Sequence, residues 1–313
     1  MKLAIVYHVY KNSASLKKSL ESIFSQTDQN FEFIFINDGA SASINKIIKE
    51  FNFSKLKKFT YLKYSQNLGH AVSFNQAIAS IKAEYVMFVG SNFIPNKSFI
   101  KLVNGILKNN PNTDVLSFNC VKNDNTYQIF NKLNSKMKLM LDQSMKDKLF
   151  SIKLLHKHKI LLNEQLYSPL IFMYQTLNLF KKWIIVDFQH ASYEKNKIYT
   201  YNFYDIFKQN DNLIDEYSQT KFWHSHNDLI EYFMINYIIL IFLIRIFHAY
   251  SQKSIKQNAL QEVKTWLDKN FPNWRNNKIL NNPKNRQPEL SIAFVKFKFK
   301  TNYVNKIIRK YKL

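Results

Sequence analysis

Four polar side chains in the first third of the chain each follow an apolar run, and their hydroxyl, carboxylate and amide groups can bind a polar ligand. They are Tyr10, Asp38, Asn67 and Asn92. If the apolar runs are strands of one parallel sheet, these side chains gather at its carboxyl edge, where α/β proteins bind their ligands. The positions therefore predict a ligand-binding site at that edge.

Three of the chain's four glycines, Gly39, Gly69 and Gly90, lie beside these polar side chains. Glycine costs backbone entropy and adds no packing, so its use here indicates backbone that bends sharply or closely approaches another group. The glycines support a site at these turns. They do not show that a reaction occurs there.

Alternating strand and helix patterns would position these residues. Apolar, β-branched runs predict strands over 2–10, 31–38, 59–64, 85–89, 114–120 and 183–188. Apolar residues at helical spacing predict helices between the first strands and another over about 165–181. Strands that alternate with helices of this length form right-handed βαβ units and a parallel sheet.

The chain changes in character near residue 195, after which it is mostly helical in pattern and strongly basic. We expect an α/β domain over 1–195 and a helical extension over 196–313 that packs on it. The apolar run from Tyr232 to Ile244 is shorter than the ~20 residues that span a bilayer, so it predicts a buried or interfacial helix.

The formal net charge of +23 is carried almost entirely by lysine, because only four of the 45 basic residues are arginine. Lysine is strongly hydrated and reads bases poorly, which argues against sequence-specific nucleic-acid binding. Residues 251–313 hold fifteen basic and three acidic residues, and aromatic and apolar residues alternate with lysine over 294–312. This pattern predicts docking on an anionic membrane surface, with an amphipathic cover for the core as the alternative.

A single cysteine, Cys120, excludes a framework of internal disulfides. The first residues also lack the pattern of a secretory signal, because their apolar stretch is short and is interrupted by His8. We therefore expect a cytoplasmic protein that associates peripherally with the inner face of the membrane.

Two stretches of the first hundred residues resemble the family-2 glycosyltransferases of the GT-A fold. They are IVYHVYKNSASLKKSLESIFSQTDQNFEFIFINDGAS and QNLGHAVSFNQAIASIKAEYVMFV, with a weaker similarity over 147–177. The resemblance implies a Rossmann-like α/β fold with a mixed, mainly parallel sheet flanked by helices. It also implies transfer of a sugar from a nucleotide-sugar donor, usually a UDP-sugar, to a lipid or glycan hydroxyl.

By the same resemblance, Tyr10 packs on the nucleotide base, and the carboxylate of Asp38 accepts a hydrogen bond from the nucleotide. Asn67 and Asn75 fall on family positions near the diphosphate. For Asp38 the alternative is a turn residue whose carboxylate binds nearby backbone N–H groups. The expected nucleotide-binding residues are Tyr10, Asp38, Asn67, Asn75, Ser91 and Asn92.

His8 stands where family members usually have proline, at the end of the first predicted strand. An imidazole there can contact a phosphate or a base. It can equally be a packed, hydrogen-bonded histidine at a strand end. Both readings stay open on the sequence.

Two family motifs lack their acidic residues in this chain. The Asp-x-Asp motif that holds Mg²⁺ or Mn²⁺ is replaced by Gly90 and Asn92, and a divalent metal is doubtful because hard cations prefer anionic oxygen ligands. The acceptor-side Tyr-Glu-Asp reads Tyr-Ser-Pro, so Ser168 and Pro169 occupy the region of the base, and Glu164 is the remaining carboxylate nearby. The chain is thus either a glycosyltransferase whose activity is metal-independent or lost, or a pseudo-glycosyltransferase that serves as a binding or assembly partner.

Overall fold

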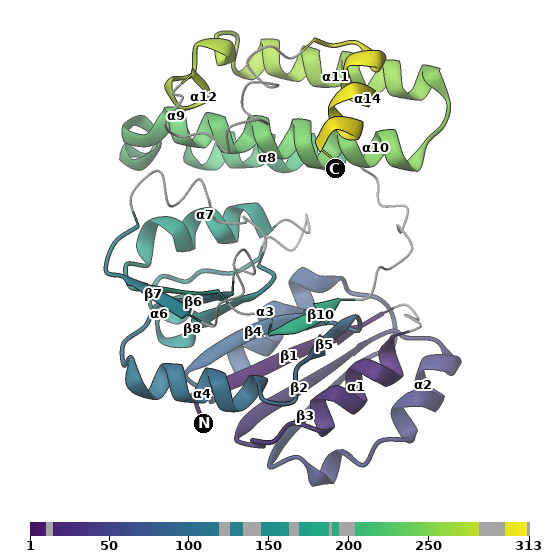
Figure 1. Ribbon diagram of the computed structural model, residues 1–313, viewed down its shortest axis with the longest axis vertical. Coiled ribbons are helices and arrows are strands. Elements are labelled where there is room, and N and C mark those ends of the chain that lie inside the picture. Colours follow the sequence, from purple (N-terminus) through teal and green to yellow (C-terminus); the bar gives the residue numbers. More distant parts are fainter. Residues whose placement is uncertain are drawn as a thin grey trace. The chain divides into compact units, whose positions relative to one another are not determined.

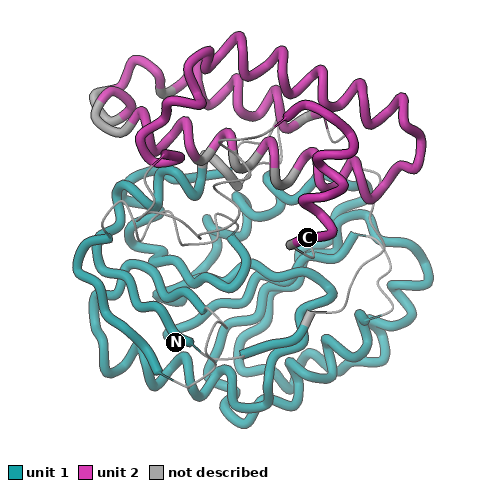
Figure 2. Tube along the Cα trace, turned by 45° about the horizontal axis from the view of Figure 1, so that its top comes forward, with its two compact units in different colours: residues 1–133, 143–197 teal, residues 134–142, 198–313 magenta. Residues whose placement is uncertain are grey.

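A computed structural model of the chain describes residues 1–10, 15–118, 126–133, 145–162, 169–187, 190–193, 204–281 and 298–311 (Figure 1). Cys120, Glu164 and Ser168 lie outside these residues. The chain divides into two compact units, coloured separately in Figure 2. Unit 1 comprises 1–133 and 143–197, and unit 2 comprises 134–142 and 198–313.

Unit 1 is built on an eight-stranded mixed sheet in the order β3-β2-β1-β4-β8-β6-β9-β7. Its first half is parallel and follows the predicted strands: β1 (Leu3–Val9), β2 (Phe31–Asp38), β3 (Lys58–Tyr64) and β4 (Tyr85–Gly90). Every residue of β1 and β2 is buried, which suits central parallel strands covered on both faces. The four strands therefore end together at one carboxyl edge.

The second half of the sheet is less regular. It consists of β8 (Lys148–Ser151), β6 (Val115–Phe118), β9 (Trp183–Asp187) and β7 (Thr126–Phe130). Strand β8 runs antiparallel to both of its neighbours, β4 and β6, whereas β6 and β9 are parallel. A separate two-stranded sheet pairs β5 (Phe93–Pro95) with β10 (Ala191–Tyr193).

Helices cover both faces of the sheet. Apolar residues of α1 (Leu16–Phe24), α2 (Ala42–Lys49) and α4 (Phe99–Asn109) form one core cluster with β1, β2 and β4. On the other face, Phe74 of α3 (His70–Ser80) contacts Phe88, which in turn contacts Phe172 of α7 (Pro169–Leu179). Helix α6 (Ile152–Lys157) directly follows β8, and the short 3-10 helix η1 (Phe53–Lys55) precedes β3.

Three carboxylates tie strand ends to distant loops, and each accepts hydrogen bonds from two consecutive backbone N–H groups. Glu32, at the start of β2, binds the amides of Lys82 and Ala83 at 3.0 and 2.9 Å. Asp114 accepts hydrogen bonds from the backbone N–H groups of Lys181 and Lys182, directly before β9, at 2.6 and 3.0 Å. Asp38 is the third, and it lies at the predicted site.

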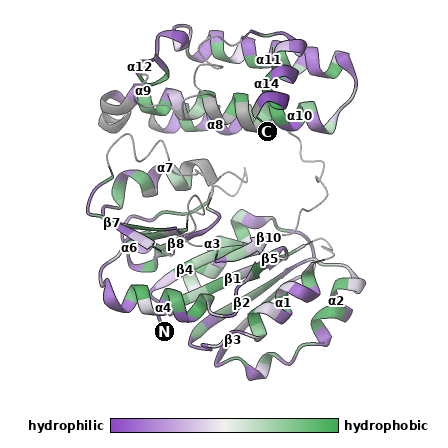
Figure 3. Cartoon of the chain, in the orientation of Figure 1, coloured by the Kyte–Doolittle hydropathy of each residue, from purple (hydrophilic) through white to green (hydrophobic). Residues whose placement is uncertain are grey.

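Unit 2 is helical in its described part. Its elements are α8 (Asp205–Tyr217), α9 (Lys221–Asn236), the π-helix η2 (Tyr237–Leu243), α10 (Ile244–Ala249), α11 (Lys253–Asn270), the 3-10 helix η3 (Trp274–Asn276), α12 (Lys278–Asn281) and α14 (Thr301–Tyr311). In Figure 3 these helices carry both hydrophobic and hydrophilic residues. Each can therefore bury one side while the other remains polar.

The apolar run from Tyr232 to Ile244 crosses the end of α9, all of η2 and the first residue of α10. Its side chains at Ile238, Phe242 and Leu243 are at most 1% exposed, so of the two settings expected for this run, buried or interfacial, these residues have the buried one. Among the described residues, none of the helices combines the length and the apolar character that a membrane crossing requires.

Candidate functional site

The carboxyl edge of the parallel strands brings most of the predicted site residues to one end of unit 1. In the sheet register, His8 lies opposite Gly90 and Val9 lies opposite Asn37. Tyr10 directly follows β1 and is half-buried. Ser91, buried, and Asn92, half-buried, directly follow β4. Pairing of the strands is thus sufficient to bring these residues to the same edge as Asp38.

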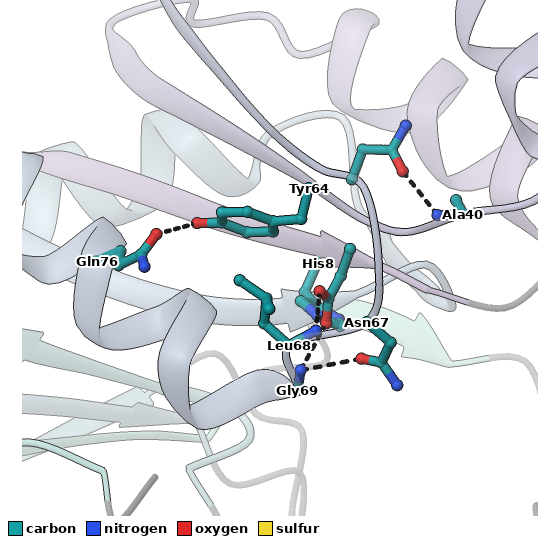
Figure 4. Close-up of polar contacts among 9 residues, drawn as sticks. His8, Ala40, Tyr64, Asn67, Leu68, Gly69 and Gln76 are labelled. Carbon is teal, nitrogen blue, oxygen red and sulfur yellow. Dashed lines mark hydrogen bonds and ion pairs between the residues drawn. The ribbon is translucent and has the colours of Figure 1, made fainter.

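Asp38 is fully buried and holds the loop that precedes α3, of which Asn67, Leu68 and Gly69 are labelled in Figure 4. Its Oδ1 accepts a hydrogen bond from the backbone N–H of Leu68 at 2.7 Å, and its Oδ2 accepts one from Gly69 at 3.0 Å. The Nε2 of His8 lies 2.9 Å from the same Oδ2. The carboxylate therefore joins the ends of β1 and β2 to the loop that carries Asn67.

The surroundings of Asp38 keep its carboxyl ionised. Burial by itself raises the pKa, but the hydrogen bonds from His8, Leu68 and Gly69 and the charge of His8 together outweigh that effect and hold the pKa of Asp38 below its ordinary value. A buried, ionised carboxylate with three donors is a rigid anchor. The sequence left open a local turn in which Asp38 binds nearby backbone, but its carboxylate binds backbone N–H groups 30 and 31 residues further along the chain, and the local turn contact is made by Asn37.

Two histidines pack together next to Asp38. The ring of His8, which is 3% exposed, lies 4.0 Å from the ring of His70 between centroids, and both rings meet Phe74 edge-on. Burial, and secondarily His8, lower the pKa of His70 to about 3, although Asp38 acts in the opposite direction. His70 is therefore neutral at physiological pH. His8 is the hydrogen-bonded strand-end histidine that the sequence allowed as one of two readings.

Sequence reasoning missed His70. The only available signal was its place directly after Gly69, at the first position of a predicted helix, and a lone histidine there has no recognisable partner in the sequence. Its contact with His8 depends on strand β1, more than sixty residues away along the chain.

The glycines explain how the strand end and the loop approach so closely. Gly39 has φ +67°, and a Cβ at this position would lie 2.6 Å from the carbonyl carbon of Gln66 and 2.7 Å from the nitrogen of Asn67. Gly69, the N-cap of α3, has φ +85°. At Gly90 a Cβ would make only an ordinary contact, 3.5 Å from Oδ1 of Asn92. The sharp bend and close approach expected from glycine are thus found at Gly39, whereas Gly90 has room for a Cβ.

The two asparagines expected near the diphosphate lie in different surroundings. Asn67 is exposed, and its Oδ1 accepts a hydrogen bond from the N–H of Gly69 at 2.9 Å, so its side chain shapes the turn (Figure 4). Asn75 is 8% exposed and exchanges two hydrogen bonds with the backbone of Leu162. Asn67 is accessible to a ligand, whereas Asn75 joins α3 to the segment after α6.

Polar contacts also fix the neighbouring turns. The Oδ1 of Asn37 accepts a hydrogen bond from the N–H of Ala40 at 2.9 Å, which closes the turn after β2. The hydroxyl of Tyr64, at the end of β3, donates to the side chain of Gln76 on α3 (Figure 4). The framework around Asp38 is therefore held from β1, β2, β3 and α3.

The residues at the end of β4 do not fit a tightly held divalent cation. Gly90 offers no side-chain ligand, and Ser91 and Asn92 offer only neutral oxygens, whereas Mg²⁺ and Mn²⁺ favour carboxylates. No group of three His, Cys, Asp or Glu side chains suited to a metal occurs within the residues the structure describes. On the acceptor side, Pro169 is the first residue of α7, and the segment with Glu164 and Ser168 is outside the described residues.

The sequence was compared with known families and proteins. The profile of the family described as "Glycosyl transferase family 2" matches residues 4–182, which is more than half of the chain. An uncharacterized glycosyltransferase of Rickettsia bellii is 33% identical over 103 residues, which make up 32% of this chain and 14% of that protein. A teichoic acid poly(glycerol phosphate) polymerase of Staphylococcus epidermidis is 30% identical over 91 residues, or 29% of this chain and 13% of that protein. The matched segment is thus a small part of both relatives.

Solved structures share the fold. The S. aureus TarS fragment 1–349 in complex with UDP-GlcNAc gives a TM-score of 0.69 at 13% identity, covering 100% of this chain and 92% of that one. The mannosyltransferase PcManGT from Pyrobaculum calidifontis, in complex with GDP-Man and Mn²⁺, gives 0.54 at 10% identity, covering 99% and 87%. At such identities the likeness shows the fold alone, and it confirms the expected mixed, mainly parallel α/β architecture of the GT-A type.

Proposed function

Because the chain belongs to glycosyl transferase family 2, we propose that it transfers a sugar from a UDP-sugar to a hydroxyl group of a glycan or lipid. The observation that carries the proposal is the ordered carboxyl edge, where Asp38 fixes the turn of Asn67 beside the ends of β1 and β4. A preorganised turn of this kind can bind a nucleotide without a large cost of ordering. The complex of TarS with UDP-GlcNAc supports UDP as the nucleotide.

In this proposal Tyr10 packs on the base, while Asn67, Ser91 and Asn92 line the side of the diphosphate. Asp38 acts mainly through the loop that it holds, since its carboxylate is buried and already accepts three hydrogen bonds. Binding of the donor does not require a carboxylate-held metal, because Gly90 and Asn92 replace the acids that would bind one. The phosphate charge is then offset by N–H and amide groups and by basic side chains of this strongly basic chain.

The acceptor is proposed to be a glycan or polyol hydroxyl, or a lipid-linked form of one. The relative named as a teichoic acid poly(glycerol phosphate) polymerase supports a glycan-like acceptor. Deprotonation of that hydroxyl would fall to the acceptor-side segment, where Glu164 is the carboxylate nearest in sequence to Ser168 and Pro169. A positioned general base is typically worth about 10²–10⁴ in rate, so the activity depends strongly on this residue.

The second candidate function is that of a pseudo-glycosyltransferase, which binds a nucleotide or a partner without turnover. It is favoured by the neutral residues at Gly90, Asn92 and Ser168, where the family has acids. Loss of both a metal site and a general base would remove most of the rate enhancement of an enzyme of this type.

Turnover assays separate the two functions. The full chain is incubated with UDP-GlcNAc and a panel of other UDP-sugars, with glycan and polyol acceptors, in Mn²⁺ and in EDTA, and UDP release and product mass are measured. We expect turnover that persists in EDTA and is lost in Asp38→Ala. Absence of turnover in the wild type with every donor and acceptor, in both conditions, would establish the binding function in its place.

We further propose that unit 2 docks on the anionic inner face of the cytoplasmic membrane through the polar side of α14. Lys306 and Arg309 have no ion pair with a described residue, and Val304, on the opposite side of the helix, is buried. Basic side chains near such a surface contribute about 1 kcal/mol each. The side chains that line one surface hollow are Asn302, Asn305, Lys306, Arg309 and Lys310.

Co-sedimentation with phosphatidylglycerol vesicles tests the docking. The variant Lys306→Glu/Arg309→Glu should lose binding to the vesicles. The control Lys101→Glu/Lys108→Glu, at exposed positions of α4 in unit 1, changes the net charge equally and should bind the vesicles nearly as well as the wild type. Equal loss in both variants would mean that total charge, and not α14, determines membrane binding.

A further inference from the structure

Asn75 and Leu162 form the contact that carries a further inference. The Nδ2 of Asn75 donates to the backbone oxygen of Leu162 at 2.9 Å, and its Oδ1 accepts from the N–H of the same residue at 2.9 Å. Two residues exchange N–H···O bonds in this manner within antiparallel sheets. The side chain thus replaces a strand partner, across 87 residues of sequence, and fixes both the position and the orientation of the chain at Leu162.

The contact is shielded and reinforced. Asn75 is 8% exposed and Leu162 is 2% exposed, so water competes little for these hydrogen bonds. One helical turn further along α3, the backbone oxygen of Ile78 lies 3.2 Å from Nε2 of His156 in α6. The segment from His156 to Leu162 is therefore attached to α3 at two places.

Helix α3 also starts at the loop that Asp38 holds, so one rigid element connects the turn of Asn67 with the chain at Leu162. In the sequence, Glu164, the carboxylate considered for the acceptor side, is two positions beyond Leu162.

We propose that Asn75 is a positioning residue for the acceptor side: through Leu162 it fixes the start of the segment that carries the acceptor-side residues, and it does not bind the donor diphosphate. Both polar atoms of its side chain already bind Leu162, and its exposed surface is small, which leaves little room for a phosphate. The catalytic part of this inference rests on the proposed sugar transfer, but the contact itself does not.

The test compares Asn75→Ala with Asn104→Ala, a control that also removes hydrogen bonds between segments. Asn104, on α4, donates to Asp28 at 2.9 Å and to the backbone of Asn30 at 3.2 Å, at the amino end of β2 and so at the opposite edge of the sheet. Four quantities are measured on the full chain: hydrogen exchange of the Leu162 amide by mass spectrometry, the Kd of UDP by calorimetry, and kcat and KM for UDP-GlcNAc.

In Asn75→Ala we expect exchange at Leu162 to rise about tenfold or more, since the amide loses its acceptor. The Kd of UDP and the KM for UDP-GlcNAc should stay within about twofold, while kcat falls about tenfold to a hundredfold, because a misplacement of about 1 Å can cost about 10² in rate. Asn75→Asp keeps the acceptor oxygen and should retain part of the protection at Leu162. Asn104→Ala should lower thermal stability without changing any of the four quantities selectively.

A Kd for UDP weakened about tenfold in Asn75→Ala, with Leu162 still protected, would show direct binding of the donor and overturn the proposal. Unchanged exchange at Leu162, or the same kinetic change in Asn104→Ala, would also overturn it. A wild-type chain that binds UDP but never turns over would refute the proposed transfer instead. The exchange and Kd measurements would then still decide whether Asn75 positions Leu162.

Discussion

Strand β2 carries a buried carboxylate at each end, and this symmetry provides a sharp test of the site. Glu32 is 1% exposed and Asp38 is 0% exposed. Glu32 binds two backbone N–H groups and lies 3.0 Å from the ammonium of Lys58, just as Asp38 binds two such groups and His8. The substitutions Glu32→Gln and Asp38→Asn therefore remove closely matched interactions from opposite edges of the sheet.

Both substitutions should destabilise the fold by a similar amount. Each replaces a charged carboxylate by a carboxamide whose single oxygen cannot serve all three donors. In Glu32→Gln it can still accept from the N–H groups of Lys82 and Ala83, which share Oε2, and in Asp38→Asn it can replace only one of the two accepting oxygens. Hydrogen bonds to a charged group contribute about 1.5–3 kcal/mol, and breaking a buried ion pair costs about 3–5 kcal/mol. Allowing for the acceptor that remains, we expect a loss of about 2–4 kcal/mol in each variant, measured by urea unfolding.

Only the substitution at Asp38 should weaken binding of UDP, because Asp38 and not Glu32 holds the loop of Asn67 to Gly69. We expect the Kd to rise about tenfold or more in Asp38→Asn, equivalent to about 1.4 kcal/mol, and to change less than about twofold in Glu32→Gln. Calorimetry at a temperature where both variants are folded measures this. If both variants bind UDP as the wild type does, or lose it equally, the loop held by Asp38 does not organise the site.

Three further predictions concern the same edge. Gly39→Ala should lower the free energy of unfolding by about 1–3 kcal/mol, because φ is +67° and the new Cβ would meet the backbone of Gln66. Gly105→Ala, inside α4, should not destabilise the fold, because a Cβ there has nothing within 4 Å. Thermal melts compare the two variants. His70 has a folded pKa of about 3, below its ordinary 6.5, so its neutral form contributes its full stabilisation above pH 6.5 and loses it as the pH falls toward 3, by up to about 1.4 kcal/mol per pH unit. His70→Gln should therefore flatten the curve of unfolding free energy against pH between pH 6.5 and 3. An unchanged slope would contradict the burial of a neutral imidazole. Gly90→Asp/Asn92→Asp should create Mn²⁺ binding detectable by calorimetry, because it adds two carboxylates, one of them at Gly90, where a Cβ makes only an ordinary contact. A double variant without measurable Mn²⁺ affinity would show that the edge cannot hold the ion even with two carboxylates.

The sequence was sufficient to predict the first half of the sheet, because the apolar runs of β1 to β4 are local and long enough to show their period. Strands β7 and β8 were not predicted. Strand β8 has only four residues, all buried and including Lys148, so it has neither an alternating nor an apolar pattern. Its antiparallel insertion between β4 and β6 is a property of tertiary pairing that no local pattern contains.

The same distinction applies to the site. Asp38 and the turn of Asn67 could be assigned to one edge from the order of strands and helices alone. The partners of these residues could not, because His8 lies 30 residues from Asp38, and Leu162 lies 87 residues from Asn75. A histidine at a strand end and an asparagine in a helix each have many possible partners, and only the packed sheet selects one.

Binding of a nucleotide at the carboxyl edge without a metal is the property on which the proposed function rests. Calorimetric titration of the full chain with UDP, once in EDTA and once in Mn²⁺, measures this in a single pair of experiments. We predict binding in both conditions, with Kd values within about twofold of each other. Binding that appears only with Mn²⁺, or no binding of UDP in either condition, would contradict the account.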